Sequence, residues 1–322
     1  MGVLTENHSA VLLRKPTLRE LVPVPIDLIR KDEKLPYPVY LKILERPVLF
    51  RSEGDEITSG RAVRLKEKID AVCIPRSALS QLIQKQELSL GSTDDTTSDT
   101  DFAFQLRNLM IAISREVESQ HDINADYLAK VQRLASTLAG SLKKRPDLSA
   151  KLIRRYSDSS LYYVSHSVNV AIYSVMIGIK LNLSLERLKV LAFGSLVHNV
   201  GNIFVPEEIL FKSAPLTVGE WRKVQDHPQK GAKLLEAFGV GPEVVQMIWQ
   251  HHERMDGKGY PIGLAGNQIH LFSRICSIAD VYDALTSTRP YRRSVSPFEA
   301  VQIMRQMTGK FDPNILRVME GT

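Results

Sequence analysis

The chain has 322 residues, of which 43% are hydrophobic and 24% are charged. That balance is typical of a soluble globular protein, and the length allows two domains and a sizeable core. The formal charge of +6 comes from 42 Lys and Arg against 36 Asp and Glu. This mild excess suits an anionic ligand. Because the basic residues form no long runs, no DNA-binding surface is expected.

The cysteines and the apolar runs indicate the cellular compartment and whether the chain spans a membrane. The two cysteines, Cys73 and Cys276, are far apart and form no CxxC pair, which favours free thiols in a reducing compartment. The longest apolar run, VNVAIYSVMIGI from Val168, is too short to cross a bilayer. The N-terminus lacks the pattern of a secretory signal. We therefore predict a cytoplasmic protein without a membrane span.

The first third of the chain has the residue pattern of a small α+β module. Residues 1–15 look like a flexible tail, and residues 16–89 alternate short β-branched stretches with Pro, Gly and charged residues. The predicted strands are VPVPIDLI, PVYLKIL, PVLFRS and AVCIP, and the predicted helices are RAVRLKEKI and RSALSQLIQKQ. Residues 90–101, rich in Ser, Thr and Asp, read as a linker that can also cap the following helix. A regulatory or interaction role for the module follows from its position alone.

From residue 102 to residue 322 almost every segment has the helical period. We expect an all-α bundle, with an especially buried helix where Val168–Leu183 is apolar on several faces. Further helices are predicted at Leu185–Val197, Val218–Phe238, Pro242–His252, Arg274–Thr286 and Pro297–Met307. The whole chain is therefore predicted to be α+β, a small mixed module followed by an all-α helical domain.

Five histidines fall at the ends or inner faces of the predicted helices: His166, His198, His227, His251 and His252. A single histidine is more often a core or surface residue than a metal ligand. Asp280, a carboxylate in an apolar helix, strengthens the case that these histidines bind a metal, because a buried carboxylate needs a partner. Asp280 is then held either by an ion pair or a hydrogen bond within the helix, or by a metal ion. Imidazoles with a carboxylate suit divalent iron, manganese or zinc.

Two further segments are open to a plain and a functional interpretation. HHERMDGKGYPIGLAG carries Lys258 and Tyr260 among four glycines, and it is either a helix connection or a loop that shapes a pocket. Arg289, Arg292 and Arg293 lie on a Pro-containing turn. They form either a solvated basic turn or a phosphate clamp, since the guanidinium fork matches phosphate oxygens.

HHERMDGKGYP, the spaced histidines and ADVYDALTSTRPYR together resemble the HD-GYP family of the HD phosphohydrolase superfamily, from about Asp158 to Met307. The resemblance implies an all-α fold and a centre of two or three metals. It also implies hydrolysis of cyclic di-GMP to pGpG or GMP through a metal-bridged hydroxide. Cyclic di-GMP is thus the expected ligand.

The resemblance also assigns roles to residues. The metal positions of the family fall on His166, His198, Asn199, His227, His251, His252 and Asp280. Among these, His198, Asn199 and Asp280 are the expected catalytic positions. Tyr260, Arg289 and Arg292 match substrate-contacting positions, and Lys258 in the same loop is expected to join them. Asp283, one turn after Asp280, is expected to orient a ligand or an arginine.

Three positions depart from the family pattern. Asn199 replaces the aspartate of the HD pair, Asn202 replaces the lysine of HDxGK, and Tyr162 replaces a glutamate that binds a third metal in some members. The last change favours two metals, with iron expected first and manganese or zinc as alternatives. A neutral Asn199 offsets metal–metal repulsion less than a carboxylate does, and losing the lysine removes a cation.

Two hypotheses follow from these departures. The chain is either a two-metal cyclic di-GMP phosphodiesterase of reduced activity, or a catalytically degenerate protein. The degenerate protein would serve as a metal-containing cyclic di-GMP receptor or as a scaffold for signalling partners. Signalling partners, or a second copy of the chain, would bind through the N-terminal module. Because the remaining pocket residues are largely intact, we favour the enzyme.

Overall fold

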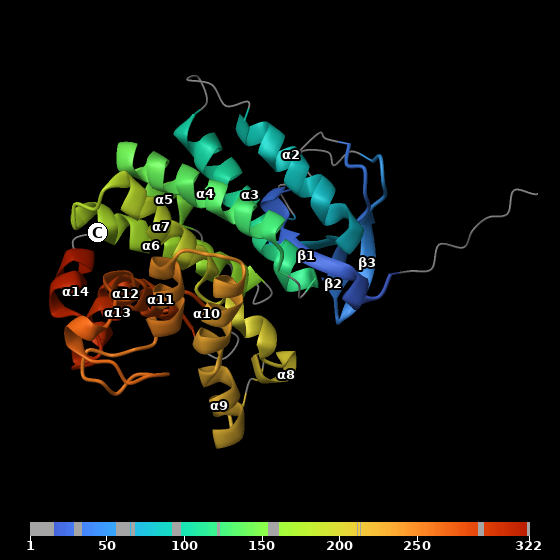
Figure 1. Cartoon of the computed structure of the whole chain (residues 1–322). Helices are drawn as coiled ribbons and strands as arrows, with labels where there is room; N and C mark the ends of the chain where they lie inside the picture. The colour runs from blue at the N-terminus through green and yellow to red at the C-terminus, as the bar shows by residue number, and fades with distance from the viewer. Residues whose placement is uncertain are drawn as a thin grey trace, which may run out of the picture.

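The computed structural model describes residues 16–28, 34–55, 65, 68–91, 98–120, 123–153, 161–210, 212, 214–288 and 293–320. A small sheet lies at one end of the molecule and helices make up the rest (Figure 1). The tail at residues 1–15 and most of the helix expected in RAVRLKEKI lie outside the described residues.

The sheet has four antiparallel strands in the order β1-β4-β2-β3. The strands are β1 (Leu21–Pro25), β2 (Val39–Ile43), β3 (Arg46–Arg51) and β4 (Ala71–Pro75). Strands β2 and β4 fall within predicted stretches, whereas β1 and β3 each begin one residue before theirs. The sheet packs on helices α2 (Leu79–Gly91) and α3 (Asp99–Gln120), with α3 against β1 (Figure 1). An α+β class is therefore confirmed.

Helix α3 begins inside the segment predicted as a linker. It starts at Asp99, and the Ser98 hydroxyl accepts a hydrogen bond of 3.1 Å from the backbone N–H of Asp101. This is the capping interaction that a Ser, Thr and Asp-rich segment favours. Residues 92–97 of the predicted linker lie outside the described residues.

The remaining helices form a bundle. They are α4 (Ala125–Lys144), α5 (Leu148–Leu152), α6 (Tyr162–Lys180), α7 (Leu185–Val197), α8 (Glu207–Leu210), α9 (Val218–Gln225), α10 (His227–Ala237), α11 (Pro242–Gln250), α12 (Leu271–Thr286), α13 (Pro297–Gln306) and α14 (Pro313–Glu320). Helix α6 packs on both α7 and α12. The bundle thus surrounds α6, the helix predicted to be the most buried.

Two hydrophobic clusters meet at α6. The first runs from the sheet through α3 and α4 to α7 and takes Val168 and Ala171 from α6. The second joins α12, α13 and α14 and takes Val170 and Tyr173. Because adjacent residues of α6 enter different clusters, the helix is apolar all round, as its sequence indicated.

The single helix predicted over Val218–Phe238 is divided in two. Helix α9 ends at Gln225, and α10 begins at His227 with Pro228 in its first turn. Proline is favoured there because it has no N–H to donate and its φ suits the first helical turn. The break places His227 at a helix start, facing inward and 3% exposed.

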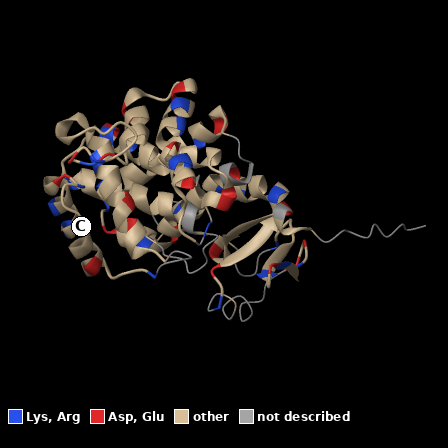
Figure 2. Ribbon diagram, turned by 90° about the horizontal axis from the view of Figure 1, so that it is seen from below, with Lys and Arg blue, Asp and Glu red and all other residues tan. Residues whose placement is uncertain are grey.

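The structure also shows how the charged residues, the apolar helices and the cysteines are distributed. Lys and Arg are interspersed with Asp and Glu along the ribbon (Figure 2). Among the described helices, none is both long and apolar enough to cross a membrane. Cys73 and Cys276 are buried and are not joined in a disulfide.

Candidate metal centre

Helix ends and helix faces bring the predicted ligands together. His198 follows α7 as its C-cap, His251 follows α11 in the same way, and His227 begins α10. His166 lies in the second turn of α6, and Asp280 lies on α12, which packs on α6. Residues that are 114 positions apart in sequence thereby meet across the contact between α6 and α12.

The candidate ligands form two groups. One contains His166, His198 and Asp280, and the other contains His227, His251 and His252; within each group the ligand atoms all lie within 4.8 Å of one another. The groups are neighbours, because the rings of His198 and His251 are 5.3 Å apart. Such spacing fits one divalent ion in each group.

Three of the histidines are oriented by the helix that precedes them. The Nδ1–H of His198 donates to the carbonyl of Ser195 at 2.8 Å. His227 and His251 donate in the same way to the carbonyl three residues earlier, at 2.7 and 2.6 Å. A bond at Nδ1 fixes the tautomer and leaves Nε2 to bind a metal. The Nε2 atoms of His227 and His251 are in fact only 3.3 Å apart.

His166 is oriented by a buried carboxylate. Its Nδ1 donates to Asp283 Oδ2 at 2.8 Å, and its Nε2 faces Asp280 Oδ1 at 3.2 Å. Asn169, one turn further along α6, donates to the other oxygen of Asp283 at 2.8 Å. Asp283 is fully buried and is hydrogen-bonded to the ring of a candidate ligand, while its orienting role stays a prediction.

Burial and mutual repulsion keep most of these imidazoles neutral. Burial lowers the pKa of His198 to about 4, with a further contribution from His166, and burial lowers the pKa of His252 to about 3. The pKa values of His227 and His251 are lowered for the same reason. His166 differs: burial opposes its charged form, but hydrogen bonds to Asp280 and Asp283 outweigh it and raise its pKa to about 9.

These residues fit a divalent metal. The buried Nε2 of His198 has no hydrogen-bond partner among the described residues, and an unsatisfied buried nitrogen is costly unless something binds it. The carboxyl of Asp280 keeps a pKa well below its usual range: burial would raise it, but His166 and the other imidazoles more than offset that. Neutral imidazoles and an ionised carboxylate are the donors that iron, manganese and zinc accept.

Asn199 lies at the junction after His198, as the N-cap residue of the short 3-10 helix η5 (Val200–Phe204). Two residues on, Gly201 makes a close contact that only glycine permits. A Cβ at that position would lie 1.9 Å from the carbonyl oxygen of His227. The turn that carries Asn199 is thereby packed directly against the start of α10.

The loop from Glu253 to Gly266, called the GYP loop below, lies against the second group of histidines. The Tyr260 ring lies 4.8 Å from that of His252. The loop is held by Glu253, whose carboxylate accepts hydrogen bonds from the backbone N–H groups of residues 262–264. Gly259 is required by packing, since a Cβ there would lie 2.5 Å from the backbone of Glu253. Tyr260 is thus fixed beside a candidate ligand, whereas Lys258 is exposed.

The arginine prediction has a different outcome. Arg289 and Arg292 lie outside the described residues, and Arg293 is described and exposed. The phosphate clamp therefore stays a prediction.

Lys310 was missed by the sequence reasoning. It precedes α14 and is partly buried, and its backbone carbonyl accepts a hydrogen bond of 3.2 Å from Met255 in the GYP loop. Burial lowers its pKa, while the charge of Asp280 opposes that effect, and its own charge helps to lower the pKa of His252. No local motif marks this lysine, because a contact between distant loops creates its environment.

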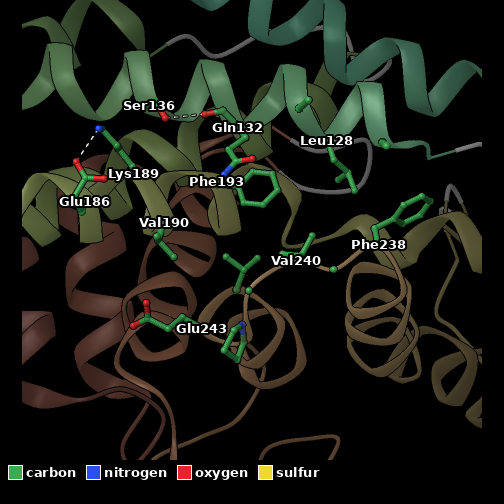
Figure 3. Close-up of a pocket in the computed structure, with 16 residues that line it drawn as sticks. Leu128, Gln132, Ser136, Glu186, Lys189, Val190, Phe193, Phe238, Val240 and Glu243 are labelled. Carbon is green, nitrogen blue, oxygen red and sulfur yellow. Dashed lines mark hydrogen bonds and ion pairs between the residues drawn. The ribbon is translucent and has the colours of Figure 1, made fainter.

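A separate pocket lies elsewhere. It has a volume of about 620 Å³ between α4, α7 and the turn that joins α10 to α11, and Phe193, Phe238 and Lys189 are among its lining residues (Figure 3). Lys189 is paired there with Glu186 at 2.8 Å. None of the candidate ligands lines this pocket, so it is distinct from the metal centre.

Comparison with known proteins identifies the family. The model of the HD domain family matches residues 126–315, more than half of the chain, and the chain therefore belongs to this family. The resemblance to the HD-GYP type that the sequence indicated is confirmed.

Two curated proteins show the similarity. A cyclic di-GMP phosphodiesterase of Pseudomonas aeruginosa is 36% identical over 190 residues, which are 59% of this chain and 46% of that protein. A 3'3'-cGAMP-specific phosphodiesterase of Vibrio cholerae is 39% identical over 162 residues, which are 50% of this chain and 38% of that protein. The chain thus matches less than half the length of these two relatives.

One solved structure shares the fold over nearly the whole chain. An HDG"Y"P protein of Bdellovibrio bacteriovorus, Bd1817, aligns with a TM-score of 0.72 and 20% identity, covering 94% of this chain and 98% of that one. The alignment therefore extends beyond the HD domain into the N-terminal part.

Proposed function

We propose that the chain is a metal-dependent phosphodiesterase that hydrolyses cyclic di-GMP to pGpG or GMP. The observation that carries this proposal is the pair of adjacent ligand groups, one with a carboxylate and one of three histidines, beside Tyr260. The names of the relatives from Pseudomonas aeruginosa and Vibrio cholerae support a cyclic dinucleotide as substrate.

The expected cofactor is two divalent ions, with iron first and manganese or zinc as alternatives. His166, His198 and Asp280 would hold one ion, and His227, His251 and His252 would hold the other. The oxygen of Asn199 is expected to contribute where the family has a bridging aspartate. Bound divalent ions polarise a phosphoryl oxygen and lower the pKa of water at the site.

The chain's own residues bind and orient the substrate. Tyr260, Lys258, Arg289 and Arg292 are the proposed contacts to cyclic di-GMP, and Asp283 keeps His166 in place through the 2.8 Å hydrogen bond.

Lys310 supplies a positive charge near Asp280 and His252. We propose that this charge takes over part of the role of the family lysine that Asn202 replaces, since a cation beside a bound phosphate would stabilise charge in the transition state.

A second candidate is a binding protein without turnover. It is favoured by Asn199, a neutral residue placed directly after the candidate ligand His198. In that case the pocket would hold metal and cyclic di-GMP and would act as a receptor or scaffold. We propose that the chain lies between these two candidates, as a phosphodiesterase of reduced activity.

The remaining proposals concern the rest of the chain. We propose that residues 16–89 form a regulatory or interaction module that binds a signalling partner or a second copy, and that the HD domain spans residues 102–322. The segment 90–101 predicted to join them contains the end of α2 and the start of α3. We further propose a cytoplasmic location and no binding to DNA.

The test combines metal content with turnover. Protein purified without oxygen is analysed for iron, manganese and zinc, and the same sample is assayed for products from cyclic di-GMP. Two metals with formation of pGpG or GMP support the enzyme. No turnover after iron or manganese is added would contradict it and leave the receptor.

A further inference from the structure

Trp221 lies at the outer end of a row of rings that leads away from the metal centre. The His251 and His252 rings are 4.1 Å apart, and Tyr260 lies 4.8 Å from His252. The next contact is between Tyr260 and Trp221, whose ring centroids are 6.0 Å apart at an angle of 76°. Trp221 is thus two ring contacts from a candidate ligand.

The indole is not used by the core. Its exposed fraction is 44%, and none of the residues of α9 is buried. In a T-shaped contact an edge of one ring meets a face of the other, so Tyr260 leaves at least one face of the indole uncovered. An exposed tryptophan with a free face, next to a site, fits an aromatic ligand better than it fits a packing role.

The helix that carries Trp221 is fixed at its N-terminal end. Thr217 and Glu220 form a capping box at the start of α9, and Lys212 pairs with Glu220 at 2.6 Å. Helix α9 projects from the bundle in Figure 1, with α8 and α10 as its neighbours. The indole is therefore held in place by contacts that do not involve the ring itself.

We infer that Trp221, together with Tyr260, is the stacking platform for a purine base of the dinucleotide whose phosphate binds at the metal centre. This inference rests on the proposed function, since it assigns the base-binding part of the same site. Every nucleobase has a π-face, and stacking on an aromatic side chain strengthens binding without reading the sequence of the base. Trp221 is then a substrate-binding residue that takes no part in the bond cleavage.

The first experiment measures fluorescence. The chain has two tryptophans, Trp221 and Trp249, so the Trp249→Phe variant leaves Trp221 as the only indole. Cyclic di-GMP added to this metal-loaded variant is expected to quench the emission with saturation, because a purine stacks on the ring. Inorganic phosphate, which has no base, is expected to leave the emission unchanged.

The second experiment measures affinity. Trp221→Leu should weaken binding of cyclic di-GMP about ten- to a hundredfold, while Trp221→Phe keeps most of the affinity and metal content is unchanged in both. Phe298→Ala is the matched control, because Phe298 is 73% exposed on α13 and should have no effect. Circular dichroism checks that each variant is folded.

The outcomes separate this inference from the proposed function, because quenching and turnover are independent readouts. Quenching without turnover supports the platform and contradicts the enzyme. Turnover with no quenching, or unchanged affinity in Trp221→Leu, overturns the platform and leaves the enzyme standing. A wild-type chain that neither binds nor hydrolyses cyclic di-GMP overturns both.

Discussion

The two ligand groups of the centre differ in charge and in their supporting contacts. His166, His198 and Asp280 include a carboxylate, and behind His166 lies the buried pair of Asp283 and Asn169. The group of His227, His251 and His252 contains no carboxylate. Two divalent cations that lie close together repel each other, and a carboxylate ligand offsets part of that repulsion. The first group should therefore bind its ion more tightly than the second.

This difference shows where the replacement of the family aspartate has its effect. A carboxylate at position 199 would add negative charge at the junction beside both groups. With Asn199 there, a second ion would be held by imidazoles and at most a neutral amide oxygen, without a carboxylate. We therefore expect stepwise loading of the centre, with one strong and one weak site.

The largest effect is expected from Asp280→Asn. The change removes the carboxylate from the stronger group, so that site should lose its ion, and hydrolysis of cyclic di-GMP should fall on the order of a thousandfold or more. Metal content per chain and initial rates measure the two effects. Glu299→Gln, an exposed carboxylate at a helix cap, is the control and should retain both. Full metal content in Asp280→Asn would show that Asp280 is not a ligand.

A smaller effect of opposite sign is expected from Asn199→Asp. Restoring the carboxylate should tighten the weaker site and raise turnover, each by about a hundredfold, or roughly 3 kcal/mol. Titration with manganese followed by assay measures both. If the variant binds metal and turns over as the parent does, Asn199 is not the residue that separates the two sites.

Lys310→Met tests the cation near the centre. Removing the charge should lower kcat about tenfold while metal content stays constant, because the methionine keeps much of the volume. The same substitution at Lys144, an exposed lysine at the end of α4, provides the comparison. Equal losses in the two variants would argue against a special role for Lys310.

The smallest effect concerns the stability of the metal-free chain as a function of pH. His198 and His252 have folded pKa values of about 4 and 3, below the value of about 6.5 for an unfolded histidine. Between these values the unfolded state binds more protons, so the free energy of unfolding should fall as pH drops below 6.5, by up to about 1.4 kcal/mol per pH unit for each histidine.

His166 acts in another pH window. Its folded pKa of about 9 lies above the unfolded value, so its contribution is fully present below pH 6.5 and is lost as pH rises towards 9. Urea unfolding from pH 4 to pH 9 measures both windows. Excess manganese should flatten the acid limb down to about pH 5, and an acid limb that is flat without metal would contradict the burial of these histidines as neutral groups.

The helical half could be predicted because its periodicity is strong. Leu185–Val197 matches α7 at both ends, and the apolar run at Val168 is the core of α6. The break between α9 and α10 was missed, because the apolar period continues across Asp226 and only Pro228 marks a new start. The four strands were found through their β-branched residues, although their order in the sheet depends on long-range pairing that no local pattern reveals.

The residues of the candidate site could be predicted where they belong to a sequence motif. All six His and Asp ligand candidates lie in the two groups, and Asp283 contacts His166. The environments of Asn169, Trp221 and Lys310 were not predicted, because contacts with residues far away in the chain create them. Asn169, for instance, is an ordinary polar residue of an apolar helix until Asp283 lies 2.8 Å from it.

The contacts of His198, His227 and His251 with carbonyls three residues earlier have a consequence for how such a protein evolves. Each ring is oriented by a hydrogen bond to its own local backbone, and that bond does not depend on the other ligand side chains. A lineage can therefore replace one donor and keep the others aligned, and a later reversal would find the site still assembled. In this architecture the candidate site can change one side chain at a time, without rebuilding the framework.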